Sequence, residues 1–319
     1  MSLLTIYRKI NAVCGLNKVF MVNFASIVLP VPVAAMAGAV GAIVETKPMN
    51  TKTLLLITML LAGTLLHART LEQGNTEAMR GVVPGNYNFW IFTPEDYDPQ
   101  GRGLPLVIFL HGASLCGNNL DRVRRYGPLD AIKKGKVVPA VVLAPQNSGG
   151  AWSPRKINEL LEWTEAHYAI DTTRIYVLGM SLGGYGTMDF VAAYPEKVAA
   201  AMALCGGCSV KQPDGLGQVP LWIIHGTGDR AVSVSQSKRV VNYLQQTGHD
   251  QLLRYDWLPG ASHGVPARLF YLQKTYDWLF SHSLRDAPRV VDRSFDIGMD
   301  DIRETYQELK WFKGMFDDD

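Results

Sequence analysis

Several features that would assign this chain to a simple class of protein are scarce or missing. Its 319 residues include only four cysteines, too few for a disulfide scaffold. The 31 basic and 29 acidic residues leave a net charge of +2, without the basic excess that nucleic-acid binding requires. The sequence holds neither an internal repeat nor a low-complexity linker. Apolar residues are plentiful at 47%, which excludes a disordered chain and allows a large buried core in one or two domains.

The first 68 residues differ in composition from the rest of the chain. They contain five basic residues and a single acid, Glu45. A short basic region, an apolar core over 53–66 and the small Ala68 form the pattern of a secretory signal peptide at 49–68. The core is shorter than the roughly 20 apolar residues of a spanning helix. We therefore expect cleavage near Ala68 and a periplasmic or secreted protein.

Residues 1–48 form an upstream extension with two interpretations. Either translation begins at Met49, or a second apolar stretch over 19–44 crosses a membrane. Pro30 and Pro32 interrupt that stretch and favour the first interpretation. Membrane contact is therefore expected only through this N-terminal segment, if it stays uncleaved.

From residue 69 onward, short apolar runs alternate with amphipathic stretches. Several runs are continuous Val, Ile and Leu segments, which suit strands buried on both faces of a mostly parallel sheet. The alternation predicts one α/β domain over 69–283, with helices on both faces of the sheet. The expected strands cover 88–93, 104–110, 140–144, 174–178, 199–204, 221–224 and 252–257, and the expected helices cover 157–168, 182–193, 234–246 and 268–280.

Two segments bear on the limits of this domain. The interval 206–220 between two expected strands is too short for several helices, so no large cap domain is expected over the site. Residues 284–319 hold six basic and ten acidic residues, which indicates a charged tail that is loosely docked or disordered. The alternative is an amphipathic helix over 300–316.

The sequence Gly179-Met180-Ser181-Leu182-Gly183 lies between an expected strand and an expected helix. A G-x-S-x-G pattern in that context predicts a nucleophile elbow, a tight turn that lifts the serine hydroxyl clear of the sheet. Side chains at either glycine would collide with the neighbouring strand and helix. Ser181 is therefore the candidate nucleophile.

A serine nucleophile needs a histidine base, and in this arrangement the histidine follows the acid in the chain. His263 lies in a flexible loop after the last expected strand, where such a base must be supplied. The other downstream histidines are placed less well, since His225 ends a strand, His249 lies in a polar turn and His282 follows the last helix.

The orienting acid should follow the penultimate strand, and Asp229 does so. It would hold the His263 ring in the required tautomer and stabilise the imidazolium. Asp214 precedes that strand and Asp256 lies inside the last one, so both are weaker candidates.

The remaining site residues are predicted from loops at the same edge of the sheet. The backbone N–H groups of Leu182 and Ala113 are the candidate oxyanion donors. His111 is expected to be a structural hydrogen-bonding residue. Substrate contacts are expected from the loops around Leu115, from Gln146 to Trp152 and around Val265, with Trp152 as a stacking platform for an aromatic or sugar ring.

Taken together, these residues resemble the α/β-hydrolase superfamily, and more narrowly the secreted bacterial esterases related to polyhydroxybutyrate depolymerases and feruloyl esterases, often labelled peptidase-like or phospholipase/carboxylesterase-like. The matching stretches are LPLVIFLHGAS, VVLAPQN, RIYVLGMSLGGYGTMDFVAAYPEKVAAAMALCGG, VPLWIIHGTGD and the SHG around His263. The resemblance spans roughly 88–283 and implies an α/β-hydrolase fold with a Ser181–His263–Asp229 triad.

The sequence departs from the family pattern at two places. Ser114-Leu115-Cys116-Gly117 stands where members often have Gly-Glu-Arg-Gly, which puts any inherited substrate in doubt. Cys205-Gly206-Gly207-Cys208 replaces a Cys-Gly-Gly-Gly stretch. Free thiols are expected, and a disulfide from Cys116 to Cys205 or Cys208 is the alternative in an oxidising compartment.

The expected activity is a serine esterase that forms an acyl-enzyme on small-molecule or polysaccharide-linked esters with short-chain or aromatic acyl groups. The alternatives are a prolyl-oligopeptidase-like peptidase and a non-catalytic binding relative, although the candidate Ser, His and Asp are all present. No metal or cofactor is expected, because the sequence lacks H-E-x-x-H, paired C-x-x-C and G-x-G-x-x-G patterns.

Overall fold

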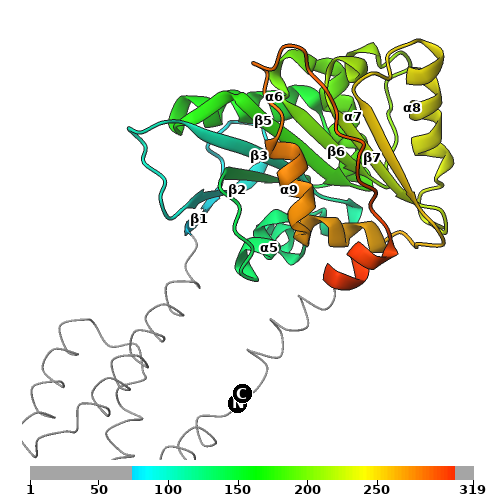
Figure 1. Ribbon diagram of the computed structural model, residues 1–319. Coiled ribbons are helices and arrows are strands. Elements are labelled where there is room, and N and C mark those ends of the chain that lie inside the picture. The colour runs from blue at the N-terminus through cyan, green and yellow to red at the C-terminus, as the bar shows by residue number, and fades with distance from the viewer. Residues whose placement is uncertain (1–73, 306–319) are drawn as a thin grey trace, which may run out of the picture. The chain divides into compact units, whose positions relative to one another are not determined.

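The computed structural model describes residues 74–305 of the chain (Figure 1). The predicted signal peptide at 49–68, the upstream extension and residues 306–319 lie outside these described residues. Among the described residues, no helix combines the length and apolarity needed to cross a membrane.

A single eight-stranded sheet organises the described residues, in the order β1-β2-β4-β3-β5-β6-β7-β8. β1 pairs with β2 and β2 with β4 in antiparallel fashion, while every pairing from β4 through to β8 is parallel. This arrangement confirms the predicted mostly parallel sheet. The strands are β1 (Gly74–Met79), β2 (Asn88–Pro94), β3 (Leu104–Leu110), β4 (Val141–Gln146), β5 (Ile170–Met180), β6 (Ala200–Leu204), β7 (Leu221–Gly226) and β8 (Leu253–Leu258).

Helices cover both faces of this sheet and divide the apolar core in two. One core cluster packs side chains of α6 (Pro154–His167), α7 (Leu182–Ala193) and α8 (Ser235–Gln246) on the sheet. The other cluster packs α5 (Pro128–Lys133) and α9 (Gln273–Phe280) on the opposite face, and Figure 1 shows α9 crossing in front of the strands. Because both faces are covered, β4 and β6 are buried at every residue, which explains their continuous apolar sequences.

The elements between β6 and β7 agree with the expected absence of a large cap. The only helical element there is a single 3-10 turn, Asp214–Gln218. The carboxyl ends of β5, β6, β7 and β8 lie next to one another, because these strands are adjacent and parallel. Residues that follow these strands therefore meet at one edge of the sheet.

The prediction of a loosely docked tail is wrong for residues 284–305. The guanidinium of Arg289 donates to the carbonyls of Val198 and Ala199, and Ile302 is only 2% exposed. The Arg254 side chain, which is also buried, donates to the carbonyls of Asp292 and Phe295. The charged composition concealed this docking because arginines bond backbone carbonyls here instead of facing solvent.

Candidate active site

Ser181 lies in a sharp turn between β5 and α7. Its φ of 59° and ψ of −120° are values that residues other than glycine seldom adopt. The Ser181 amide donates to the Leu204 carbonyl at 2.8 Å, which ties the turn to the end of β6. A Cβ at Gly183 would lie 1.8 Å from the Leu110 carbonyl oxygen, and one at Gly179 would lie 2.4 Å from the Gly183 carbonyl oxygen. Both glycines are therefore required by backbone contacts, as the sequence pattern predicts.

The Asp229 carboxylate lies beside the His263 ring, with Oδ2 2.6 Å from Nδ1. The Asp229 side chain is fully buried, whereas 27% of the His263 side chain remains exposed. The other carboxylate oxygen accepts hydrogen bonds from the Ala231 and Val232 amides at 2.8 and 2.9 Å. Burial raises the pKa of Asp229, but hydrogen bonds from His263 and these two amides outweigh it and leave the pKa below its ordinary value. The carboxylate therefore stays ionised beside the imidazole.

The rival acids have other partners. Asp256 accepts a hydrogen bond from the Trp222 indole at 2.6 Å and pairs with Arg254, and Asp214 accepts one from the Tyr243 hydroxyl. The loop that carries His263 is in turn anchored to the end of β6, where the Cys205 thiol donates to the His263 carbonyl at 3.7 Å. Within residues 74–305 no hydrogen bond joins Ser181 to the His263 ring, and such bonds are often loose in unliganded enzymes.

The two candidate oxyanion donors lie at helix starts on this edge of the sheet. Leu182 is the first residue of α7 and Ala113 is the first residue of a 3-10 turn, Ala113–Leu115, so the turns themselves use neither N–H. Ala113 is exposed to solvent. Both amides are thus available to an incoming carbonyl oxygen.

Tyr126 is a neighbour of this site that the sequence patterns do not reveal. Its hydroxyl accepts a hydrogen bond from the Gly112 amide at 2.6 Å. A Cβ placed on Gly112 would lie 2.9 Å from that hydroxyl and 3.3 Å from the Ser181 Cβ, so the phenol lies near Ser181. Burial raises the pKa of Tyr126 and keeps it protonated. The sequence did not indicate Tyr126, because this residue belongs to none of the motifs.

The prediction of Trp152 as a stacking platform is wrong, and the side chains of Gln146 and Leu115 are buried as well. Trp152 is 3% exposed, and its indole donates to the His111 carbonyl and packs against Gly186. Gln146 donates to the carbonyls of Leu115 and Asn119, and the Leu115 side chain is itself buried. These side chains pack and form hydrogen bonds inside the loops, so none offers a surface on which a substrate could stack.

His111 and the cysteines have the structural roles expected of them. The His111 Nδ1 bonds the Gly112 carbonyl and Nε2 accepts from the Asn147 amide, and burial lowers the pKa of His111 to about 4. Cys116, Cys205 and Cys208 are all free, so the alternative of a disulfide is wrong. Burial raises the pKa of Cys205 to about 12, which keeps this thiol protonated beside Asp229.

Comparison with known proteins gives a family match over most of the domain. The model of the Esterase family, described as "Putative esterase", matches residues 81–256. An esterase of Mycobacterium tuberculosis is 28% identical over 144 residues, covering 40% of this chain and 30% of that protein. A bifunctional acetylxylan esterase/xylanase of Neocallimastix patriciarum is 26% identical over 167 residues, covering 49% of this chain and 23% of that protein.

A solved structure supports the same fold. A thermostable esterase superposes with a TM-score of 0.56 and 27% identity, covering 67% of this chain and 64% of that one. The alignments with the two curated relatives span less than a third of either relative's length. The similarity therefore concerns one α/β-hydrolase domain within larger proteins.

Proposed function

Since the chain belongs to the Esterase family, we propose that it is a serine hydrolase of carboxylic esters that acts through Ser181, His263 and Asp229. The observation that carries this proposal is the buried Asp229–His263 pair at the edge of the sheet where Ser181 occupies its strained turn. A buried, ionised acid bonded to a partly exposed histidine is the arrangement that general-base catalysis by imidazole needs.

In the first half of the reaction, the Ser181 hydroxyl oxygen attacks the ester carbonyl while His263 Nε2 takes the hydroxyl proton. The Leu182 and Ala113 amides bind the resulting oxyanion. His263 then gives its proton to the alcohol oxygen, and the bond between that oxygen and the carbonyl carbon breaks. The alcohol departs, and Ser181 remains acylated. In the second half, His263 takes a proton from water as the water oxygen attacks the acyl carbonyl. The bond between the acyl carbon and Ser181 Oγ then breaks, His263 returns the proton to Oγ, and the acid is released.

For the substrate, we propose an ester with a short-chain or aromatic acyl group, carried by a small molecule or a polysaccharide. The single 3-10 turn between β6 and β7 leaves no large cap there to enclose a long acyl chain. The acetylxylan esterase activity named for the Neocallimastix relative supports an acyl group attached to a polysaccharide. We further propose export, directed by a signal peptide at 49–68 that is cleaved near Ala68.

A panel of p-nitrophenyl esters tests the reaction class. Rates are expected to fall from acetyl or butyryl to decanoyl, and feruloyl esters and acetylated xylan should also be hydrolysed. A rise with chain length, or a jump in rate at a lipid interface, would contradict the proposed acyl class. Faster cleavage of a proline-containing amide than of p-nitrophenyl acetate would indicate a peptidase instead.

A further inference from the structure

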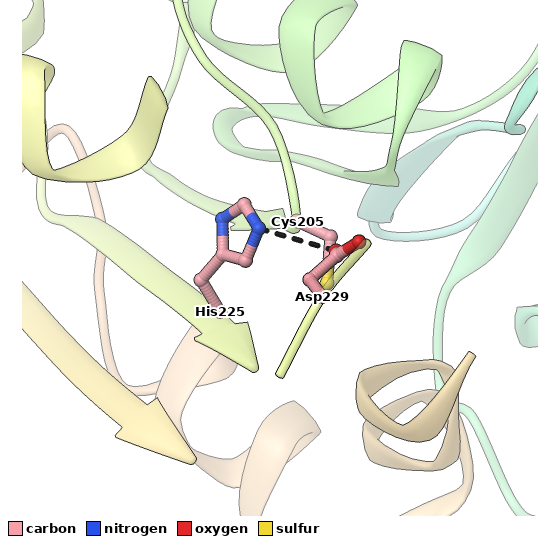
Figure 2. A group of neighbouring side chains, drawn as sticks. All are labelled: Cys205, His225 and Asp229. Carbon is pink, nitrogen blue, oxygen red and sulfur yellow. Dashed lines mark ion pairs between the residues drawn. The ribbon is translucent and has the colours of Figure 1, made fainter. Parts of the chain in front are cut away.

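His225, near the end of β7, is a second histidine on the candidate acid. Its ring is fully buried, and Nε2 lies 3.2 Å from Asp229 Oδ2 (Figure 2). That same oxygen lies 2.6 Å from His263 Nδ1. One carboxylate oxygen therefore faces two histidine rings, of which only His263 reaches toward solvent.

The Val232 peptide closes a ring of contacts around this carboxylate. Its N–H donates to Asp229 Oδ1 at 2.9 Å, and its carbonyl lies 2.9 Å from His225 Nε2. Asp229 is thus held at Oδ1 by backbone amides and at Oδ2 by the two histidines. Rotation of the carboxylate about its χ2 angle would break contacts on both sides at once.

The positions of the acceptors decide which His225 nitrogen carries a proton. Nε2 faces the Val232 carbonyl and an ionised carboxylate, which both only accept, so Nε2 must be the donor. Nδ1 lies 2.8 Å from the Ser237 hydroxyl, which can direct its proton either at this nitrogen or at the Gly206 carbonyl, also 2.8 Å away. Burial lowers the pKa of His225, which favours the neutral ring with its single proton on Nε2.

Cys205, His225 and Asp229 have ligand atoms within 4.8 Å of one another, as a metal site or a thiol nucleophile would require. The contacts favour neither role. The Nε2 proton of His225 is already directed at Val232 and Asp229, and Nδ1 at Ser237. The Cys205 thiol is buried and protonated. The titratable groups that face His225 are therefore Asp229, Cys205 and, across the carboxylate, His263.

We infer that His225 is a positioning residue, whose Nε2–H bond to Asp229 fixes the carboxylate that orients His263. This inference rests on the proposed function. By placing a donor on Oδ2, His225 also withdraws some negative charge from the oxygen that faces His263. It therefore tunes how readily the catalytic base takes up a proton, although it touches no substrate.

A matched pair of substitutions separates the two ends of the His225 ring. His225→Gln can place an amide N–H near the Nε2 position, whereas His225→Asn reaches only the Nδ1 position and the Ser237 hydroxyl. We expect kcat on p-nitrophenyl acetate to fall about 10- to 100-fold in His225→Asn, with KM little changed, and largely to recover in His225→Gln. Fluorophosphonate titration counts active sites, so a misfolded fraction does not enter kcat.

Two further readouts distinguish positioning from a purely structural role. In the Asp229→Asn background, His225→Asn should have little additional effect on kcat, because the carboxylate it orients is gone. The acid limb of the pH profile of kcat/KM should move to higher pH in His225→Asn but not in His225→Gln, since Oδ2 regains negative charge. Equal losses in both variants with unchanged pH profiles would overturn the inference.

Nitrogen-15 NMR of the histidine rings can be measured on the wild-type protein, so this test does not require a folded variant. It should find His225 protonated on Nε2, and an Nδ1-protonated neutral ring would overturn the inference. A wild-type chain that neither hydrolyses esters nor reacts with fluorophosphonate would instead overturn the proposed function. An active wild type matched by His225→Asn in kcat and pH profile would overturn only the role of His225.

Discussion

The candidate nucleophile and the candidate acid–base pair lie on the same edge of the sheet but are held in different ways. Ser181 is placed by the backbone: its amide bonds Leu204, and Gly183 lies against the Leu110 carbonyl. Asp229 and His263 are placed by side chains, through bonds that join β7, its following loop and the loop after β8. The first arrangement leaves a local sequence pattern, whereas the second is dispersed along the chain.

Because the two parts are held differently, different kinds of substitution should disrupt them. A backbone-defined turn fails when atoms are added, because there is no space between main-chain segments. A side-chain network fails when a donor or acceptor is removed, because a buried polar group then loses its partner. Added atoms should therefore damage the Ser181 turn most, and lost donors or acceptors should damage the Asp229–His263 pair most.

The largest effect is expected from Ser181→Ala, which removes the oxygen proposed to attack the ester. We expect kcat for p-nitrophenyl acetate to fall by about 10⁶-fold and fluorophosphonate labelling to disappear. Thermal unfolding should change little, since only one hydroxyl at a surface turn is lost. A Ser181→Ala protein with normal esterase activity would refute the assigned nucleophile.

On the side-chain half, Asp229→Asn should lower kcat by about 10⁴-fold, because the amide favours the wrong tautomer of His263. Steady-state kinetics on p-nitrophenyl acetate measures the loss. Asp214→Asn is the matched control, since that exposed carboxylate bonds Tyr243 away from the pair, and it should keep nearly full activity. Similar losses in both variants would show that Asp229 has no special role.

On the backbone half, Gly183→Ala should destabilise the fold by about 4 kcal/mol or more, or prevent folding, because the new Cβ would lie 1.8 Å from the Leu110 carbonyl oxygen. Gly264→Ala is the control beside His263. Its φ of −78° suits alanine and nothing lies within 4 Å of the added Cβ. Urea unfolding of the two variants measures the difference, and equal stability would contradict a backbone-limited turn.

A smaller effect is expected from His111, which is fully buried and is kept neutral by that burial. A folded-state pKa of about 4, against 6.5 in the unfolded chain, means that the unfolded state binds the proton first as the pH falls. Protonation of His111 in the unfolded chain should therefore lower the free energy of unfolding by about 3 kcal/mol as the pH falls from 6.5 to 4. Above pH 6.5 His111 is neutral in both states and should have no such effect.

Urea unfolding at several pH values measures this loss. His111→Gln keeps an acceptor for the Asn147 amide but does not titrate, so it should show a weaker decline across the same interval. An identical decline in the two proteins would assign the acid sensitivity to other groups.

The two halves of the site also differ in how much of each could be predicted from the sequence. Ser181, its glycines and the mostly parallel sheet follow from local patterns that the structure reproduces. Asp229 and His263 required a rule of chain order, and the contact of His225 with Asp229 depends on where a loop folds back. No local pattern carries such information.

The errors have similar physical causes. Trp152 was expected at the surface because a tryptophan in a loop looks the same whether it packs or binds, and only the fold shows it buried. β1 escaped prediction because its sequence, GNTEAM, is polar and its residues are at most half-buried at the edge of the sheet. Residues 284–305 looked solvated because their arginines bond distant carbonyls, a contact that composition cannot reveal.

The docking of residues 284–305 also protects the free edge of the sheet. β8 is an edge strand, and the Arg293 guanidinium donates to the carbonyl of Leu253 on it, at 2.8 and 3.0 Å. Unpaired edge carbonyls invite strands from other molecules, and a charged side chain bonded there discourages that pairing. A chain truncated at Ser283 would keep every candidate catalytic residue yet expose this edge. Self-association and precipitation at high protein concentration would then limit its use before any loss of chemistry did.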